Sequence, residues 1–142
     1  MATSKGKFEK LINDIAENLE WEVAWEDDMA SVDFEAESGN NLTLYISNDE
    51  GAIQFDVASD AGFASEDDIP HEVSTQLLKR NLLLDIGAWV VEAWGDEWYY
   101  SVVYSTNIEA LEPMEYEEIQ GIVDALIEEC DEFNEICAEE NE

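Results

Sequence analysis

The hydrophobic residues of this sequence recur with two different spacings, and the order of those spacings limits the folds open to it. In residues 4–19 they recur every three or four positions, the period of one helix face. In residues 21–57 they alternate with polar residues, the period of a strand with one buried and one exposed face. The helical spacing returns in residues 70–84 and 113–136. The sequence therefore predicts an α+β fold built on an antiparallel β-sheet.

The alternating region divides into short strands at residues that favour turns. The predicted strands cover residues 32–36, 42–46 and 53–57. Gly39-Asn40-Asn41 and Asn48-Asp49-Glu50-Gly51 separate them, because Gly and Asn tolerate the left-handed backbone of a tight turn. Residues 21–25 fit either a first short strand or the exit of the helix. The meander therefore has three antiparallel strands, or a fourth if residues 21–25 join it.

Two further strands are predicted between the second and the last helix. Residues 88–93 and 98–104 are rich in aromatic and β-branched residues, and Trp94-Gly95-Asp96-Glu97 makes a tight turn between them. The second of these strands is apolar on both faces, which indicates a central strand or one whose outer face meets a partner. Pro113 is expected to open the last helix. The predicted order is α-β-β-β-α-β-β-α in a single domain, residues 1–142, with residues 138–142 as a frayed acidic tail.

The second predicted helix, from Pro70 to the early eighties, has more leucines than one buried face requires. Leu77 and Leu84 continue the face begun at Val73, whereas Leu78 and Leu82 lie on an adjacent face. This surplus predicts a second burial surface, such as a subunit interface.

The acidity of the chain limits its partners. Thirty-seven acidic residues against five basic ones give a formal net charge of −32. Such a surface repels nucleic-acid phosphates and anionic lipid headgroups, and it attracts basic proteins or cations. The chain is nevertheless 46% hydrophobic and 11% aromatic, which argues against disorder. We therefore expect the charge to lie outside a conventional core, with no nucleic-acid or membrane partner.

The residues that catalysis or metal binding would need are absent or scattered. The only histidine, His71, is expected at an exposed helix start, and no glycine-rich loop has phosphate-binding spacing. Asp27-Asp28 and Glu66-Asp67-Asp68 lack the ligand pattern of a calcium loop. Cys130 and Cys137 lie seven residues apart on a predicted helix, too far for a disulfide. We expect no enzymatic activity, catalytic site, cofactor or metal.

The expected compartment is the cytoplasm. No apolar stretch typical of a signal peptide follows the lysines of the first ten residues, and no segment approaches the ~20 apolar residues of a membrane span.

The order of elements resembles the fold of class I type III secretion chaperones and of the YbjN-like family. The likeness is best in the second half. Residues 77–82 followed by 87–89 are similar to that fold's passage from helix to strand. Residues 99–104, 108–111 and 113–133 are similar to its closing strand and helix. The resemblance implies a small acidic protein, usually a homodimer, that binds other polypeptides without ATP. Secretion chaperones wrap an extended client segment with apolar grooves and strand edges.

The function expected from these observations is a non-enzymatic protein-binding module, chaperone- or adaptor-like, with a protein or peptide partner. The candidate partner-binding residues are Leu78, Leu82, Trp89 and Tyr99, and the alternative is that these four fill the monomer core or the dimer seam. A second hypothesis is an acidic mimic of nucleic acid, or a chaperone for a basic protein, that acts by charge. Its carboxylates should then cluster on one face.

Overall fold

An antiparallel six-stranded sheet forms the centre of the protein, with strand order β1-β2-β3-β4-β6-β5. The structure is a computed structural model and describes residues 4–27, 29–58 and 62–140. The strands are β1 (Val23–Glu26), β2 (Met29–Glu35), β3 (Asn41–Asp49), β4 (Ala52–Ala58), β5 (Ala88–Trp94) and β6 (Glu97–Asn107). The helices are α1 (Ser4–Leu19), the 3-10 turn η1 (Glu66–Asp68), α2 (His71–Asn81), α3 (Ile108–Leu111) and α4 (Tyr116–Glu140).

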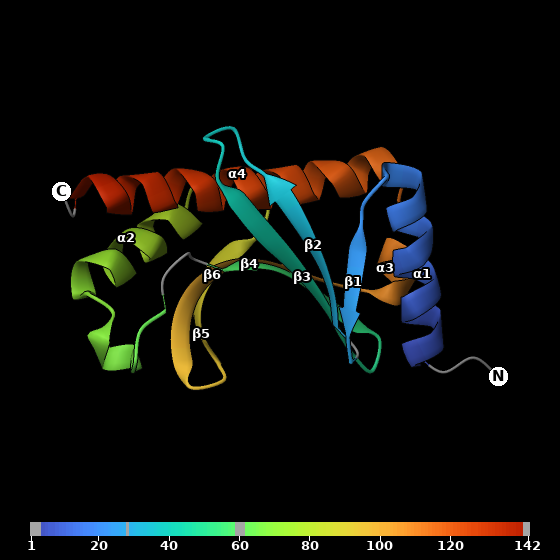
Figure 1. Cartoon of the computed structure of the whole chain (residues 1–142), viewed down its shortest axis with the longest axis horizontal. Coiled ribbons are helices and arrows are strands. Elements are labelled where there is room, and N and C mark those ends of the chain that lie inside the picture. Colours follow the sequence, from blue (N-terminus) through green and yellow to red (C-terminus); the bar gives the residue numbers. More distant parts are fainter. Residues whose placement is uncertain (1–3, 28, 59–61, 141–142) are drawn as a thin grey trace.

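Helix α4 runs along the length of the sheet, with α1 near one end and α2 near the other (Figure 1). It contacts β3, β4, β6 and α1, whereas α2 contacts β5. Alternate strand residues point into the core beneath α4, and Leu44, Phe55 and Val102 are completely buried there. Each such side chain contributes about 1.5–3 kcal/mol to folding. This inner face of the sheet is therefore the main source of stability.

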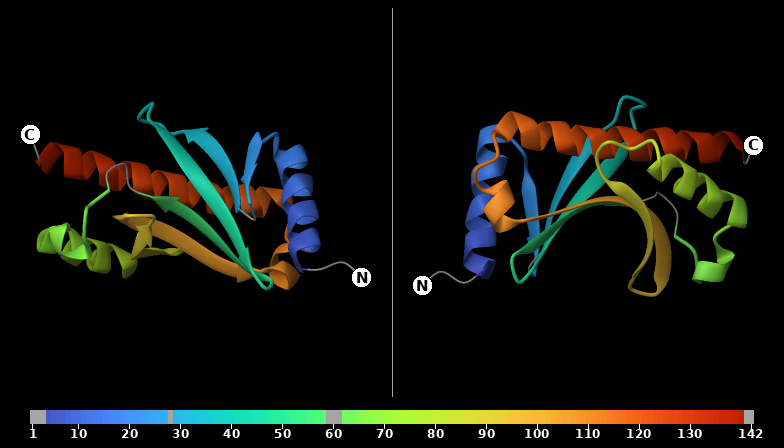
Figure 2. Two further views of the ribbon diagram at one scale, coloured as in Figure 1. Left: turned by 60° about the horizontal axis from the view of Figure 1, so that its bottom comes forward. Right: turned by 180° about the vertical axis from the view of Figure 1, so that it is seen from behind.

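The opposite, outer face of the sheet carries mixed polar and apolar residues. The strand register places Tyr45 of β3, Asp56 of β4 and Val103 of β6 in one row across this face. Ser101 of β6 lies on the same face, two residues from Val103, and pairs with Ala58 of β4 and Val90 of β5. The β5–β6 hairpin curves strongly away from α4, toward this outer face (Figure 2). Asp56 and Ser101 are both buried on this face.

Glycines permit the tight turns between neighbouring strands. Gly51, with a φ of 97°, joins β3 to β4 directly after Glu50, whose φ is also positive. Gly95, with a φ of 62°, lies in the β5–β6 turn. Both turns were predicted from the sequence, because left-handed backbone costs glycine little.

The α+β class and the antiparallel sheet are confirmed, the structure decides the alternative left open for residues 21–25, and one detail of the predicted order needs correction. Residues 23–26 form strand β1, so four strands precede α2, because Val23 pairs with Val32 along the edge of β2. Pro113 does not open the last helix: it lies between the short helix α3 and α4, which begins at Tyr116. Helix α4 continues to Glu140, so residues 138–140 are helical, and residues 141–142 lie outside the described part.

Candidate protein-binding surface

Helix α2 follows Pro70, whose φ of −57° suits the position just before a helix. Lys79 and Arg80 occupy its last turn, where positive charge is favoured by the helix dipole. The backbone remains helical through Leu82, and the N–H groups of Leu82 and Leu83 donate to the carbonyls of Lys79 and Arg80. Leu82 and Leu83 therefore lie in the turn that completes α2.

Two contacts fix α2 to the rest of the protein. Leu77 is buried in the core. The Asn81 side chain accepts a hydrogen bond from the backbone N–H of Trp89 and donates to the Trp89 carbonyl at 3.2 Å. The amide thus pairs with the backbone of β5 as a neighbouring strand would, and α2 is held beside the edge of the sheet.

A charged network joins α2 and β5 to α4. Arg80 donates twice to the Glu129 carboxylate, from Nε at 2.7 Å and from Nη2 at 2.6 Å. The Trp89 indole Nε1 donates to the same carboxylate at 2.7 Å. The hydrogen bond to Glu129 raises the pKa of Arg80 above its ordinary value. Bidentate pairs of this kind are geometrically specific, so the network fixes α2 against α4.

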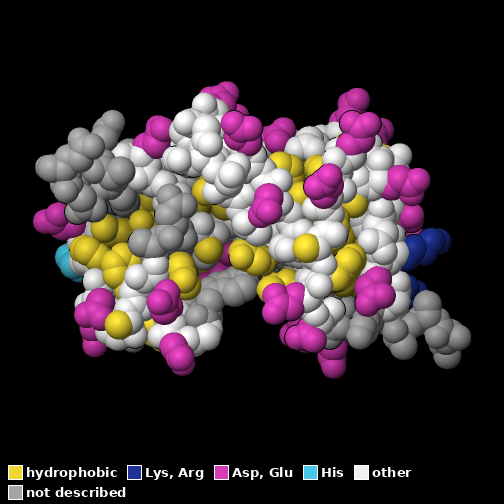
Figure 3. All heavy atoms as spheres, in the orientation of Figure 1, with side chains coloured by type: hydrophobic (Ala, Val, Ile, Leu, Met, Phe, Trp, Pro, Cys, Tyr) yellow, Lys and Arg dark blue, Asp and Glu magenta, His cyan; other side chains and the backbone are white. Residues whose placement is uncertain are grey.

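With Leu77 and Arg80 directed inward, three leucines at the C-terminal end of α2 are left exposed. Leu78, Leu82 and Leu83 are 71%, 88% and 81% exposed. Leu78 and Leu82 are four residues apart and therefore lie on the same helix face. We call these three residues the leucine patch. Figure 3 shows hydrophobic side chains gathered over α2, beside the single histidine, with Asp and Glu side chains around them.

The four residues predicted to bind a partner do not form one surface. Leu78 and Leu82 belong to the leucine patch. Trp89 is only 4% exposed and lies in the core, so we leave it out of the surface. Tyr99 lies half-buried on the outer face of the sheet, and its hydroxyl donates to Glu97 at 2.8 Å, which raises the pKa of Tyr99.

Sequence reasoning missed Leu83 as a member of this surface. The signal was present as a run of three leucines, residues 82–84, at the end of a helix. A helix face cannot bury three consecutive leucines at once, so at least one must be directed elsewhere. In the structure Leu84 packs partly against the core, whereas Leu82 and Leu83 do not.

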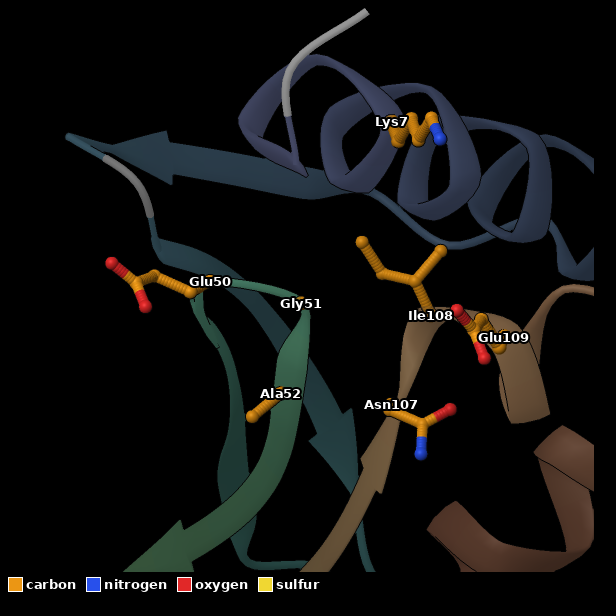
Figure 4. A pocket seen from close by; sticks show the side chains of 7 residues that line it. All are labelled: Lys7, Glu50, Gly51, Ala52, Asn107, Ile108 and Glu109. Atoms are coloured by element: carbon orange, nitrogen blue, oxygen red, sulfur yellow. The ribbon is translucent and has the colours of Figure 1, made fainter.

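A pocket of about 420 Å³ lies at the opposite end, between α1, the β3–β4 turn and the start of α3 (Figure 4). Its polar groups are already used within the fold: the Asn107 side chain accepts from the Ala110 N–H, and the Ile108 N–H donates to the Gly51 carbonyl. Lys7 and Glu109 lie at its rim. The pocket presents no buried charged group toward a ligand, so we assign it no site.

A second pocket, of about 490 Å³, lies between the β2–β3 turn and α4 and is lined by acidic side chains. The deepest of them, Asp131, accepts a hydrogen bond from the Ser38 hydroxyl at 2.6 Å. This contact fixes the turn to α4. The carboxylates are not confined to this pocket, because in Figure 3 they occur at both ends of the molecule.

Among the described side chains, no three of His, Cys, Asp or Glu gather closely enough to hold a metal ion. His71 is exposed, as expected, and lies 3.5 Å from the Thr75 hydroxyl. Cys130 is buried in the core. Asp28 and the side chains of Glu66 and Cys137 lie outside the described residues. No helix in the described ranges is long and apolar enough to cross a membrane.

Comparison with solved structures identifies the fold. A chain of the HopA1–SchA chaperone–effector complex matches with a TM-score of 0.60, covering 93% of this chain and 96% of that one. The two sequences are 15% identical, so the likeness is one of fold. No family model matches the sequence, and no curated protein matches it. The secretion chaperone-like fold expected from the order of elements is thus confirmed.

Proposed function

We propose that this chain is a non-enzymatic protein-binding module, chaperone- or adaptor-like, that binds a polypeptide partner without ATP. The observation that carries the proposal is the leucine patch on α2. Burial of each exposed leucine would contribute about 2 kcal/mol to an interface. Contiguous exposed leucines are uncommon on monomeric proteins and are typical of interaction sites. The similarity to a chain of a chaperone–effector complex also supports a role in binding other polypeptides.

We further propose that the chain forms a homodimer and that it acts in the cytoplasm. A second copy is one occupant that the leucine patch suits, because a self-complementary apolar helix face needs no positive charge on its partner. The polypeptide partner then binds across the seam of the dimer, where it also contacts the leucine patches.

The first experiment separates binding by apolar contact from binding by charge. Wild-type protein and the variant Leu78→Ser/Leu82→Ser/Leu83→Ser would be used to capture partners from a native lysate, with nucleotide removed, at low and at high salt. Tyr116→Ser serves as the matched control, because Tyr116 is another exposed large side chain, on α4. Apolar recognition survives high salt and is lost in the triple variant but not in the control.

The opposite pattern would favour the second hypothesis, in which acidity alone binds a basic protein or mimics nucleic acid. Partners would then dissociate at high salt and remain bound to the triple variant. Capture of nothing by wild-type protein under either condition contradicts both hypotheses.

Sedimentation equilibrium tests the dimer separately. We expect wild-type protein and the Tyr116→Ser control to sediment as dimers and the triple variant as a monomer. A wild-type monomer at high concentration would remove the dimer from the proposal and leave the leucine patch available to the polypeptide partner.

A further inference from the structure

Two buried polar side chains on the outer face of the sheet are incompletely satisfied. Asp56 of β4 is 3% exposed and Ser101 of β6 is completely buried. Gln54 donates from Nε2 to Oδ2 of Asp56 at 3.2 Å. Within the described residues, Oδ1 of Asp56 and Oγ of Ser101 make no hydrogen bond of good geometry, although the Ser101 hydroxyl lies close enough to Asp56 to oppose the rise in its pKa. A buried carboxylate that is ionised and only partly hydrogen-bonded is costly, so this site requires a proton or a positive charge.

A second carboxyl group reaches Asp56 from the far side of β6. Glu92 of β5 lies within hydrogen-bonding range of the Asp56 side chain. Asp56 is level with Val103, and Glu92 is level with Tyr99, four residues further along β6. In a flat sheet their Cα atoms would be roughly 16 Å apart, two strand spacings across and four residues along. The contact therefore depends on the bend of the β5–β6 hairpin (Figure 2).

No basic residue of the strands is available to neutralise this pair. The five basic residues of the chain are Lys5, Lys7, Lys10, Lys79 and Arg80, and all fall within α1 and α2. The other titratable groups on this part of the outer face are Tyr45 of β3 and Tyr99 of β6, with Glu97 hydrogen-bonded to Tyr99. Burial, together with the Glu92 carboxylate, raises the pKa of Asp56 from 3.8 to about 8.

We propose that Asp56 and Glu92 share one proton at neutral pH, and that this proton holds the β5–β6 hairpin bent over the outer face. Two ionised carboxylates are both acceptors and repel each other, whereas one proton between them supplies the missing donor. Loss of the proton as the pH rises leaves two negative charges in contact and loosens the hairpin. The inference stands on the sheet alone and does not depend on the proposed function.

Carboxyl 13C NMR of the wild-type protein tests the shared proton directly. We expect the Asp56 carboxyl to titrate far above the ordinary carboxyl range. A signal of Asp56 that titrates in the ordinary range overturns the proposal. So does loss of the high step on addition of Ca²⁺ or Mg²⁺ at a few millimolar, because the site would then hold a cation.

Amide hydrogen exchange tests the effect on the hairpin. Asp56→Asn and Glu92→Gln each replace the shared proton with an amide hydrogen that the pH range does not remove. Glu35→Gln, at an exposed position of β2, is the control. The protection of the β5 amides is compared with that in Asp56→Asn at the same pH. By this measure, wild-type protein and the Glu35→Gln control should lose protection several-fold as the pH rises from about 6.5 to about 9. Equal protection in all four proteins contradicts the proposal.

Discussion

At the scale of single residues, Glu129 connects three elements: α2, β5 and its own helix α4. It accepts hydrogen bonds from Arg80 of α2 and from Trp89 of β5, and the Arg80 guanidinium lies 5.6 Å from the centre of the Phe133 ring. The Arg80 and Glu129 side chains are 21% and 11% exposed, so the pair is largely withdrawn from water. Removing one partner of such a pair leaves the other partly buried without compensation.

We therefore expect Glu129→Ala to lower the free energy of unfolding by about 2–4 kcal/mol. The loss has two causes, the uncompensated guanidinium and the unsatisfied indole N–H. Glu128→Ala, at the neighbouring exposed position, is the control and should change stability by less than about 0.5 kcal/mol. Urea denaturation followed by tryptophan fluorescence measures both. Equal effects of the two variants would show that the hydrogen bonds of Glu129 contribute nothing to stability beyond the loss of one negative charge from α4.

The raised pKa of Asp56 also predicts how stability depends on pH. The native state binds this proton more tightly than the unfolded state, because the pKa is about 8 when folded and 3.8 otherwise. The contribution of Asp56 is therefore complete below about pH 4 and is lost as the pH rises toward 8. Between about pH 6.5 and 8.5, where exposed carboxylates are already ionised, wild-type stability should fall and Asp56→Asn stability should stay level. Thermal unfolding across this range provides the measurement.

At the scale of elements, the passage from α2 to β5 depends on one glycine. Gly87 has a φ of 83°, and a Cβ there would lie 2.8 Å from the Val103 carbonyl oxygen and 2.9 Å from Leu126 Cδ2. Both the backbone conformation and the close approach of β6 and α4 exclude a side chain. This glycine brings β5 against β6 directly after the helix.

Gly87→Ala should destabilise the protein by about 1–3 kcal/mol, through strain and the displaced Val103 backbone. Gly121→Ala, in the interior of α4, should have the opposite sign and stabilise by about 0.5–1 kcal/mol, because a Cβ there meets nothing within 4 Å. Denaturant midpoints of the two variants give the comparison. Destabilisation by both substitutions would contradict the argument.

Sequence patterns were sufficient to predict which segments form helices and strands, but not which tertiary contacts their side chains make. Alternation around Phe55 and Val57 placed Asp56 on a polar outer face, whereas the structure buries it. Trp89 and Leu82 are both large apolar residues beside turns, yet one lies in the core and the other in solvent. The periodicity of α2 separated Leu77 from Leu78. The buried indole of Trp89, however, donates its hydrogen bond to Glu129, forty residues away, which no local pattern contains.

At the scale of the whole molecule, a net charge of −32 surrounds a conventional hydrophobic core. Figure 3 shows carboxylates spread over the visible face from one end to the other. Mutual repulsion among them opposes folding, and mobile ions weaken that repulsion over a Debye length of about 8 Å at physiological salt.

We therefore expect the melting temperature to rise by several degrees as NaCl increases from about 20 to about 300 mM. A neutral osmolyte at matched osmolality is the control for effects that do not depend on charge. A melting temperature that does not change with salt would mean that the carboxylates are too far apart to repel each other appreciably.

The confinement of every lysine to α1 and α2 has a practical consequence for handling the protein. Amine-reactive dyes, resins and crosslinkers will attach only to these two helices or to the amino terminus. Lys79 is exposed and directly follows Leu78, so immobilisation through amines places the support beside the leucine patch. Surfaces prepared that way will mask the region whose partners are sought.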